Sequence, residues 1–220
     1  MAKSFDTQPP TEIADDQPVA AQHAGGTPDG IAPGYALEPG GGPAIWIGGS
    51  LMTMKARARD TDGGYSLMET FGPRDLAAPG HVHENESEAF YILDGTIDLG
   101  VGDTVYHAQP GSFVHVPKQT VHDWRITSAT CRFLVFVLPA GFEHFFEELA
   151  DPAQSLTFPY TEHRAPTPDE FLSVGSRYAW RPERGPQGTG AVFPPMAGRL
   201  VTSAEASDIP GDDARRRRKG

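Results

Sequence analysis

Cysteine is almost absent from this sequence, since Cys131 is the only one among 220 residues. A single thiol excludes an intramolecular disulfide and any zinc site built from a cluster of cysteines. Long apolar runs are absent too, because none approaches the roughly 18 residues of a membrane-spanning helix. Residues 1–10 also lack the apolar core of a signal peptide. We therefore expect a soluble cytoplasmic protein that contacts no membrane.

Positive charge is scarce as well. Lys and Arg number 18 against 29 Asp and Glu, which leaves a net charge of −11. An acidic surface repels nucleic acid, so we expect no nucleic-acid partner. Five of the 18 basic residues stand together at 215–219. We interpret this run as a solvated tail, with a weak contact to an anion as the alternative.

Long helical segments are lacking because glycine and proline interrupt the chain so often. The 25 glycines and 21 prolines make up about a fifth of the residues, against roughly 12% in average proteins. This composition argues against a helix bundle. Many of these residues stand in 1–43, and 198–220 is poor in aromatic residues. We expect both segments to be flexible, because they cannot bury enough apolar surface to offset the entropy of ordering.

The sequence has instead a series of short segments in which apolar and polar residues alternate, separated by turns such as Asp94-Gly95. Alternation with period two is typical of β-strands, and Asp-Gly is a strong hairpin signal. No segment of crossover length separates these strands, which argues against a parallel sheet. We therefore predict an all-β antiparallel sandwich or closed barrel. The ten predicted strands are 44–47, 51–58, 65–70, 81–83, 89–93, 96–101, 104–107, 112–116, 121–126 and 131–138.

Helical periodicity first appears after residue 141. Phe142, Phe145, Phe146 and Leu149 recur at helical spacing, and polar residues occupy the other positions of 143–148. This pattern predicts a helix over 142–149. We expect the helix to lay its aromatic stripe against the outside of the barrel.

A second helix is predicted from Pro168 to about Tyr178. Thr167 is a candidate N-cap, and Glu170 stands three residues later, which is the spacing of a capping box. Packing is a sufficient reason for this helix, and a role as a lid over the barrel mouth is the alternative. The chain then divides into a flexible segment 1–43, a barrel 44–140, a helical or irregular cover 141–197 and a flexible tail 198–220.

Five of the eight histidines fall within the 42 residues 81–122. His81 and His83 are two residues apart, so their imidazoles face the same side of a strand. Glu88 can reach them from the next strand, and His122 comes from a later one. These residue types together predict a site for one divalent first-row metal ion, for which Fe, Ni, Co, Mn, Cu and Zn are all suitable. For the histidines at 23, 107, 115, 144 and 163 we expect ordinary hydrogen bonds or solvent.

The same residues carry a resemblance to the cupin superfamily. Its first motif is His-x-His, four residues, Glu, six residues and Gly. The sequence is similar to it at His81, His83, Glu88 and Gly95, in residue type and in spacing. The second motif resembles the segment that runs from Gly111 through Pro117 to His122.

Three positions depart from these motifs. Asp75 and Gln119 stand where the motifs have glycine, and Ile126 stands where the second motif closes with asparagine. Gln119 affects the turn before His122, because glycine at that position can serve a positive φ. His122 is the matched fourth ligand, and His115 is its substitute if that turn is rebuilt.

Further segments at 46–49, 61–67 and 139–146 resemble single-domain cupins related to quercetin 2,3-dioxygenase. The resemblance implies a cupin jelly-roll barrel in which His81, His83, Glu88 and His122 hold one divalent metal ion. It favours Ni, Co or Fe, with Mn, Cu and Zn also compatible. A homodimer is implied as well.

The resemblance also implies a metal-dependent dioxygenase that cleaves or oxidises a flavonol or another enolic aromatic or polyketide compound with O2. Glu88 would be both a metal ligand and the general base. By alternation, Phe90 and Ile92 share a side with Glu88, and Trp124 shares one with His122. They predict an apolar pocket for a flat aromatic substrate, with plain barrel core as the alternative. Two other functions remain open: a redox-neutral zinc-type polyketide cyclase or isomerase, and a non-catalytic ligand-binding cupin.

Overall fold

The computed structural model describes residues 34–157 and 166–187. Residues 1–33 and 198–220 of the predicted flexible segments, including the basic run at 215–219, lie outside the described residues. Within the described ranges the chain forms twelve β-strands, two α-helices and one short 3-10 helix, η1 (Ala58–Asp60). All ten predicted strands are confirmed, with shifts of a few residues at their ends.

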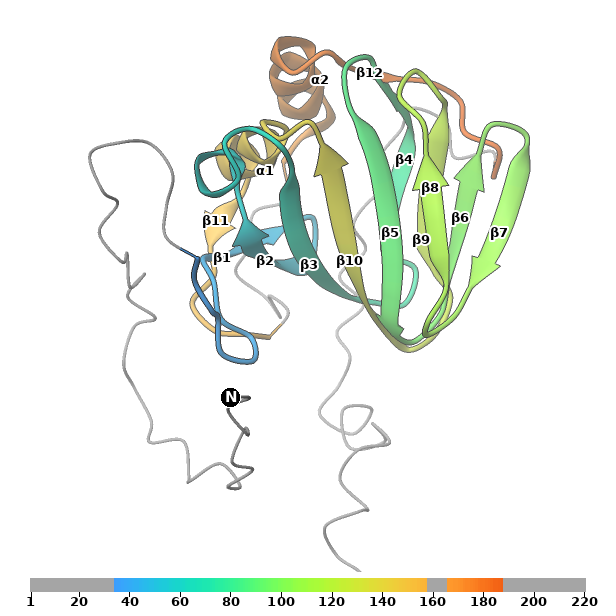
Figure 1. The fold of residues 1–220 in the computed structure, drawn as a ribbon. Helices are drawn as coiled ribbons and strands as arrows, with labels where there is room; N and C mark the ends of the chain where they lie inside the picture. The colour runs from blue at the N-terminus through green and yellow to red at the C-terminus, as the bar shows by residue number, and fades with distance from the viewer. Residues whose placement is uncertain (1–33, 158–165, 188–220) are drawn as a thin grey trace, which may run out of the picture.

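The strands form two antiparallel sheets that face each other across one interior (Figure 1). Some neighbouring strands come from distant parts of the sequence, and β10 lies between β3 and β5, as in a jelly roll. In sheet order, the larger sheet contains β11 (Asp151–Pro152), β1 (Ala44–Ile47), β2 (Ser50–Ala56), β3 (Ser66–Pro73), β10 (Thr130–Leu138), β5 (Ser87–Asp94) and β8 (Phe113–Val116). The smaller sheet contains β12 (Trp180–Pro182), β4 (Ala77–His83), β9 (His122–Ile126), β6 (Ile97–Val101) and β7 (Thr104–Ala108).

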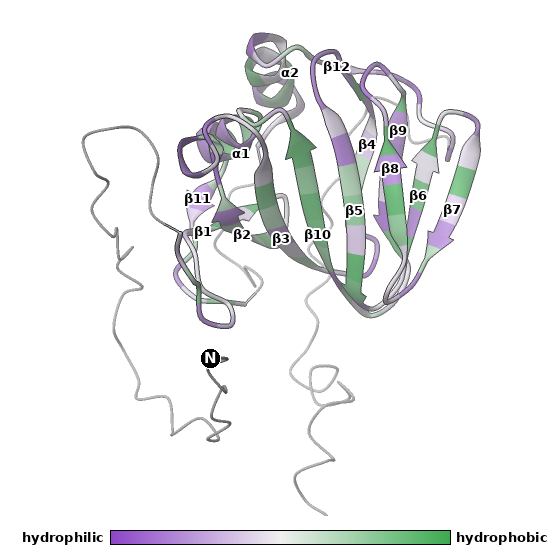
Figure 2. Cartoon of the chain, in the orientation of Figure 1, coloured by the Kyte–Doolittle hydropathy of each residue, from purple (hydrophilic) through white to green (hydrophobic). Residues whose placement is uncertain are grey.

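Alternation along β3 and β10 separates the two faces of the larger sheet. Every second residue of each strand is buried, and the apolar ones of these residues join the shared core. Met68, Phe133 and Ile97 are among the fully buried side chains of this core. Apolar residues also run along most of β10 in Figure 2. Because burial of apolar surface is worth about 25 cal/mol per Å², this core holds the two sheets together.

Helix α1 (Glu143–Leu149) forms where the aromatic periodicity predicts it and packs at the end of the barrel where β10 finishes (Figure 1). The ring of Phe142 lies edge-on to that of His83, with centroids 4.2 Å apart. The ring centroids of Phe145 and Trp180 are 5.9 Å apart. The aromatic stripe therefore closes one end of the interior instead of lying on the outer face of a sheet.

Helix α2 (Pro168–Arg177) confirms the predicted capping box. The backbone N–H of Glu170 donates to the Thr167 hydroxyl at 3.3 Å, and the N–H of Thr167 donates to the Glu170 carboxylate at 2.8 Å. This exchange satisfies two backbone donors at the helix start and fixes where α2 begins. Within 34–157 and 166–187, neither helix combines the length and the apolar character that a membrane span requires.

Two short strands, β11 and β12, were not predicted from the sequence. Strand β11 pairs with β1 at the edge of the larger sheet, and β12 pairs with β4, with Trp180 opposite His83 and Pro182 opposite His81. Strands of two and three residues are too short to show alternation. The described part of 141–197 thus contributes a strand to each sheet, and the domain boundaries proposed from the sequence remain predictions.

Candidate metal centre

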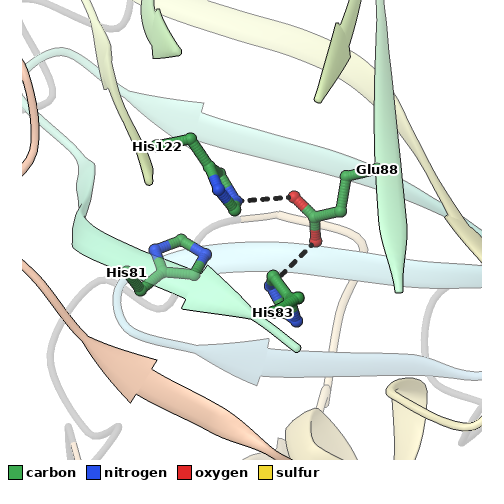
Figure 3. Close-up of side chains that lie close together, drawn as sticks. All are labelled: His81, His83, Glu88 and His122. Carbon is green, nitrogen blue, oxygen red and sulfur yellow. Dashed lines mark ion pairs between the residues drawn. The ribbon is translucent and has the colours of Figure 1, made fainter. Parts of the chain in front are cut away.

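The four predicted ligands come from three strands that meet near one end of the interior (Figure 3). His81 and His83 lie at the end of β4, and the period of two turns both rings inward. His122 begins β9 and stands opposite His81 in the ladder between β4 and β9. Glu88 lies near the start of β5 in the other sheet and points back across the interior.

The donor atoms of these four side chains form a close group. Glu88 Oε1 is 3.4 Å from His83 Nε2, and Glu88 Oε2 is 3.2 Å from His122 Nε2. All four donor atoms, including that of His81, lie within 4.8 Å of one another, and all four residues are buried. Two ligands at 2.0–2.2 Å from one ion are at most about 4.4 Å apart, so a slight contraction would bring this set around a metal.

Backbone carbonyls fix the orientation of two imidazole rings. His81 Nδ1 lies 2.7 Å from the carbonyl oxygen of Pro79, and His122 Nδ1 lies 3.0 Å from that of Thr120. An Nδ1–H that donates to a carbonyl leaves Nε2 as the unprotonated ring nitrogen. The Nε2 atoms of both rings are therefore available as ligands.

The third ring has no such hydrogen bond, and it lies beside an acidic residue that the sequence analysis did not single out. His83 Nδ1 lies 3.8 Å from Glu86 Oε2, and neither atom has a hydrogen-bond partner although both are buried. Glu86 stands three residues after His83 and two before Glu88. No periodicity in the sequence distinguishes Glu86 from the neighbouring acidic residues 84 and 88.

Burial and mutual charge set the protonation of the cluster. Burial, followed by the neighbouring His122 and His83, holds the pKa of His81 well below its ordinary value. Burial also lowers the pKa of His83, to about 4, although Glu88 opposes the shift. For Glu88, burial raises the pKa, but His83 and His122 outweigh it and the net pKa is lowered. Neutral imidazoles beside an ionised carboxylate are the protonation states that bind metal.

The chemistry of this donor set fits a divalent metal ion. The Nε2 atoms of His83 and His122 are buried and make no hydrogen bond. Unsatisfied buried nitrogen atoms cost free energy unless a partner is present. A divalent first-row ion would satisfy both nitrogen atoms and the Glu88 carboxylate together.

The departures from the cupin motifs do not displace a ligand. Gln119 adopts φ +61° and Asp75 adopts φ +66°, so both non-glycine residues occupy the left-handed region. The Gln119 N–H donates to the His83 carbonyl at 2.7 Å, which ties the turn before His122 to strand β4. His115 is exposed on β8 and lies outside the cluster. The third departure, Ile126, is a core residue.

Where the structure describes them, the remaining histidines make ordinary hydrogen bonds, as the sequence analysis predicts. His107 Nδ1 is 2.7 Å from Asp98, and His144 Nδ1 is 2.8 Å from Glu147, with both histidine side chains exposed. Histidines 23 and 163 lie outside the described residues.

A cavity of about 90 Å³ adjoins the candidate ligands. Phe90 and Trp124 line it, in agreement with the predicted pocket, whereas Ile92 is buried in the core and does not reach the cavity. Alternation predicts which face of a strand a side chain occupies. It does not predict where along the barrel the side chain lies. The cavity is also lined by an aromatic cover, which we define as Phe142, Phe145, Phe146, Phe171 and Trp180.

The aromatic cover was only partly visible in the sequence. Helical spacing found the three phenylalanines at the start of α1, and a lid over the barrel mouth was the alternative role of the helix that contains Phe171, but nothing in the sequence indicated Trp180. Trp180 reaches it because β12 pairs with β4 and brings the indole ring 5.6 Å from the ring of His81.

Two facing antiparallel sheets, with three buried histidines and a glutamate between them, define a jelly-roll barrel with an internal candidate metal site. Residues 67–137, which include all four candidate ligands, match the cupin domain family. Residues 67–137 are therefore a cupin domain.

Among characterised proteins, the chain is similar to quercetin 2,3-dioxygenase of Bacillus subtilis (strain 168), with 35% identity over 132 residues. The match covers 60% of this chain and 39% of that enzyme, so it spans well under half of the relative's length. Solved structures with similarity include KdgF from Halomonas sp., at 14% identity and TM-score 0.40, covering 50% of this chain and 90% of that one. An RmlC-like cupin from Shewanella frigidimarina has 15% identity and TM-score 0.41. That match covers 46% of this chain and 88% of the other.

Proposed function

We propose that this protein is a metal-dependent dioxygenase that cleaves or oxidises a flavonol-like or other enolic aromatic or polyketide substrate. The observation that carries the proposal is the buried cluster of three histidines and Glu88 beside an apolar, aromatic cavity. The identity with a quercetin 2,3-dioxygenase supports the same chemistry.

His81, His83, Glu88 and His122 are the residues that would hold the metal. A bound divalent ion supplies a Lewis-acidic position at which an enolate oxygen and O2 can be activated. The donor set suits Ni, Co or Fe, and also Mn, Cu or Zn. His81, His83 and His122 contribute neutral nitrogen atoms, so the charge of Glu88 alone offsets part of the charge of the ion.

Glu88 is the proposed general base. Its lowered pKa keeps the carboxylate ionised at neutral pH, so it can accept the proton of a substrate enol. Its two oxygen atoms lie 3.4 and 3.2 Å from the nitrogen atoms of His83 and His122, so the accepted proton would sit within the ligand cluster. Both atoms of O2 then enter the product as the enolic ring opens.

The aromatic cover supplies the apolar surroundings of this reaction. Its rings line the same cavity as Glu88 and offer apolar surface to an aromatic substrate. The cavity of about 90 Å³ is small beside the roughly 300–1,000 Å³ of pockets for drug-sized ligands. Binding of a flavonol therefore requires the cover to move outward.

The test begins with elemental analysis of the purified protein, followed by oxygen uptake with a panel of flavonols and enolic diketones. We expect stoichiometric metal and oxygen consumption with at least one member of the panel. Glu88→Gln should lower kcat by about 10²–10⁴, the usual contribution of a general base, and its metal content should be measured in parallel. Metal-loaded protein that consumes no oxygen with any member would contradict the proposal, and turnover without oxygen would indicate a cyclase or isomerase.

A further inference from the structure

A buried hydroxyl faces the cavity away from the candidate ligands and has no hydrogen-bond partner among the described residues. Thr70, on β3, lines the cavity and is 2% exposed. Its hydroxyl oxygen is buried and makes no hydrogen bond. The residues around this part of the cavity are apolar, among them Met52, Phe133 and Val135. A hydroxyl without a partner in such surroundings is destabilising, and valine would fill the same space without that cost.

The sheet register places Thr70 at the opposite end of the cavity from Glu88. Glu88 pairs with Val137 of β10, whereas Thr70 pairs with Phe133 on the same strand. Four residues along a strand correspond to about 13 Å. Val135, which lies between these two positions on β10, also lines the cavity. The cavity thus has a candidate metal site at one end and a single hydroxyl at the other, with apolar walls between them.

We propose that Thr70 is a specificity-determining residue whose hydroxyl binds a polar group at the end of the substrate remote from the enol. The inference rests on the proposed function and narrows its substrate class to elongated aromatic compounds with a second hydroxyl or carbonyl group. A threonine hydroxyl can donate and accept a hydrogen bond, so it suits either group. A substrate without the distal group would leave Thr70 unsatisfied and would bind less tightly.

The chain offers a matched control for this proposal. Ser66 lies on the same strand, four residues before Thr70, and its hydroxyl is also buried without a hydrogen bond. Ser66 does not line the cavity. Removing either hydroxyl removes a similar free-energy cost, that of burying an unpaired polar group. Of the two residues, only Thr70 is placed to contact a bound substrate.

The experiment compares Thr70→Val with Ser66→Ala in the metal-loaded, full-length protein. Binding of two flavonols is measured by titration of their absorbance: quercetin, which has hydroxyl groups on both distal rings, and 3-hydroxyflavone, which shares the enol but lacks them. We expect Thr70→Val to weaken binding of quercetin about three- to tenfold, the value of one hydrogen bond, and to leave 3-hydroxyflavone within about twofold. Ser66→Ala should change neither.

A conservative variant separates the role of the hydroxyl from that of side-chain shape. Thr70→Ser keeps the hydroxyl and should retain the preference for quercetin. Thr70→Ala replaces Thr70→Val in the comparison if the valine variant does not fold.

Each other outcome is decisive. Equal weakening of both flavonols by Thr70→Val, or no weakening of either, overturns the role of Thr70. Wild-type protein that binds neither flavonol overturns the substrate class and the Thr70 proposal together. Wild-type protein that binds both without consuming oxygen overturns only the dioxygenase activity, and the comparison of affinities still decides the role of Thr70.

Discussion

The candidate ligands and the aromatic cover border the same cavity, yet different contacts hold them in place. The three histidines stand on the paired strands β4 and β9, with His81 directly opposite His122, and Glu88 stands on β5 of the facing sheet, where backbone hydrogen bonds to β10 and β8 fix its register. The cover consists of rings from two helices and a short edge strand that pack against one another, as Phe142 does on Phe145 with centroids 4.8 Å apart. The ligand cluster is thus set by the backbone, and the cover by side-chain packing.

A few polar contacts fasten the cover to the barrel. Glu143, fully buried at the start of α1, accepts hydrogen bonds from the N–H groups of Ala58 at 2.6 Å and Gly141 at 2.7 Å. Glu148 joins α1 to the end of α2 by accepting from Arg177 and from the Tyr178 hydroxyl. Loss of one such contact should loosen the cover while the strand-borne ligands keep their places. Variants that damage one region and spare the other can test this difference.

The largest effect is expected from removal of a ligand. His122→Ala should lower the affinity for the metal by more than about 100-fold, because loss of a residue that only supports a ligand already costs 10–100-fold. Metal content after dialysis, determined by elemental analysis, checks this result. His115→Ala, a change of an exposed histidine outside the cluster, is the control and should keep its metal. Full metal content in His122→Ala would refute the proposed ligand set.

The next largest effect is expected from the cover. Trp180→Ala should lower the free energy of unfolding by up to about 3–5 kcal/mol, the usual cost of deleting a buried aromatic ring. Trp180 contacts Phe145, Phe171 and His81, so its loss opens the cover next to the ligands. Urea unfolding measures the change, with Leu172→Ala on the exposed side of α2 as the control. Retention of metal alongside this loss would support separate stabilisation of the two regions.

A smaller effect is expected from the contact that anchors the cover. Glu143→Gln should cost about 1–3 kcal/mol at neutral pH, because one of two partly buried N–H groups loses its acceptor. Burial raises the pKa of Glu143, but the N–H groups of Ala58 and Gly141 outweigh it and the net pKa is lowered. Its stabilising contribution is therefore complete above the ordinary glutamate pKa and is lost as the pH falls through the lowered value. The difference in stability between wild type and variant should shrink on acidification, and a constant difference would contradict this explanation.

The smallest effect is expected at the turn that supports His122. Gln119→Gly should raise stability by about 0.5–1 kcal/mol, since the left-handed conformation costs a non-glycine residue about 1–2 kcal/mol and the greater freedom of unfolded glycine offsets part of this gain. Thermal unfolding should show an increase of a few degrees. Lys118→Gly, at the adjacent exposed position with a negative φ, is the control and should lower stability. A lower melting temperature for Gln119→Gly would show that its side chain stabilises the turn.

The strands and the close grouping of the candidate ligands could be predicted because both depend on short-range patterns. Alternation with period two identified all ten main strands, and the spacing of His81, His83 and Glu88 placed three donors together before their neighbours were known. The same reasoning assigned Ile92 to the pocket, and the structure places it in the core instead. Period two gives the face of a strand, whereas position along the barrel depends on how the two sheets pack.

The sequence by itself determined the all-β architecture and the identity of the candidate ligands, because strand periodicity and motif spacing are local properties of the chain. Tertiary structure alone decided which residues complete the cavity. Trp180 covers it through the pairing of β12 with β4, and Thr70 is left as an unpartnered hydroxyl at its far end. Glu86 came to lie beside the ring of His83 in the same way. These placements follow from contacts across the barrel, where long-range packing decides which side chains meet.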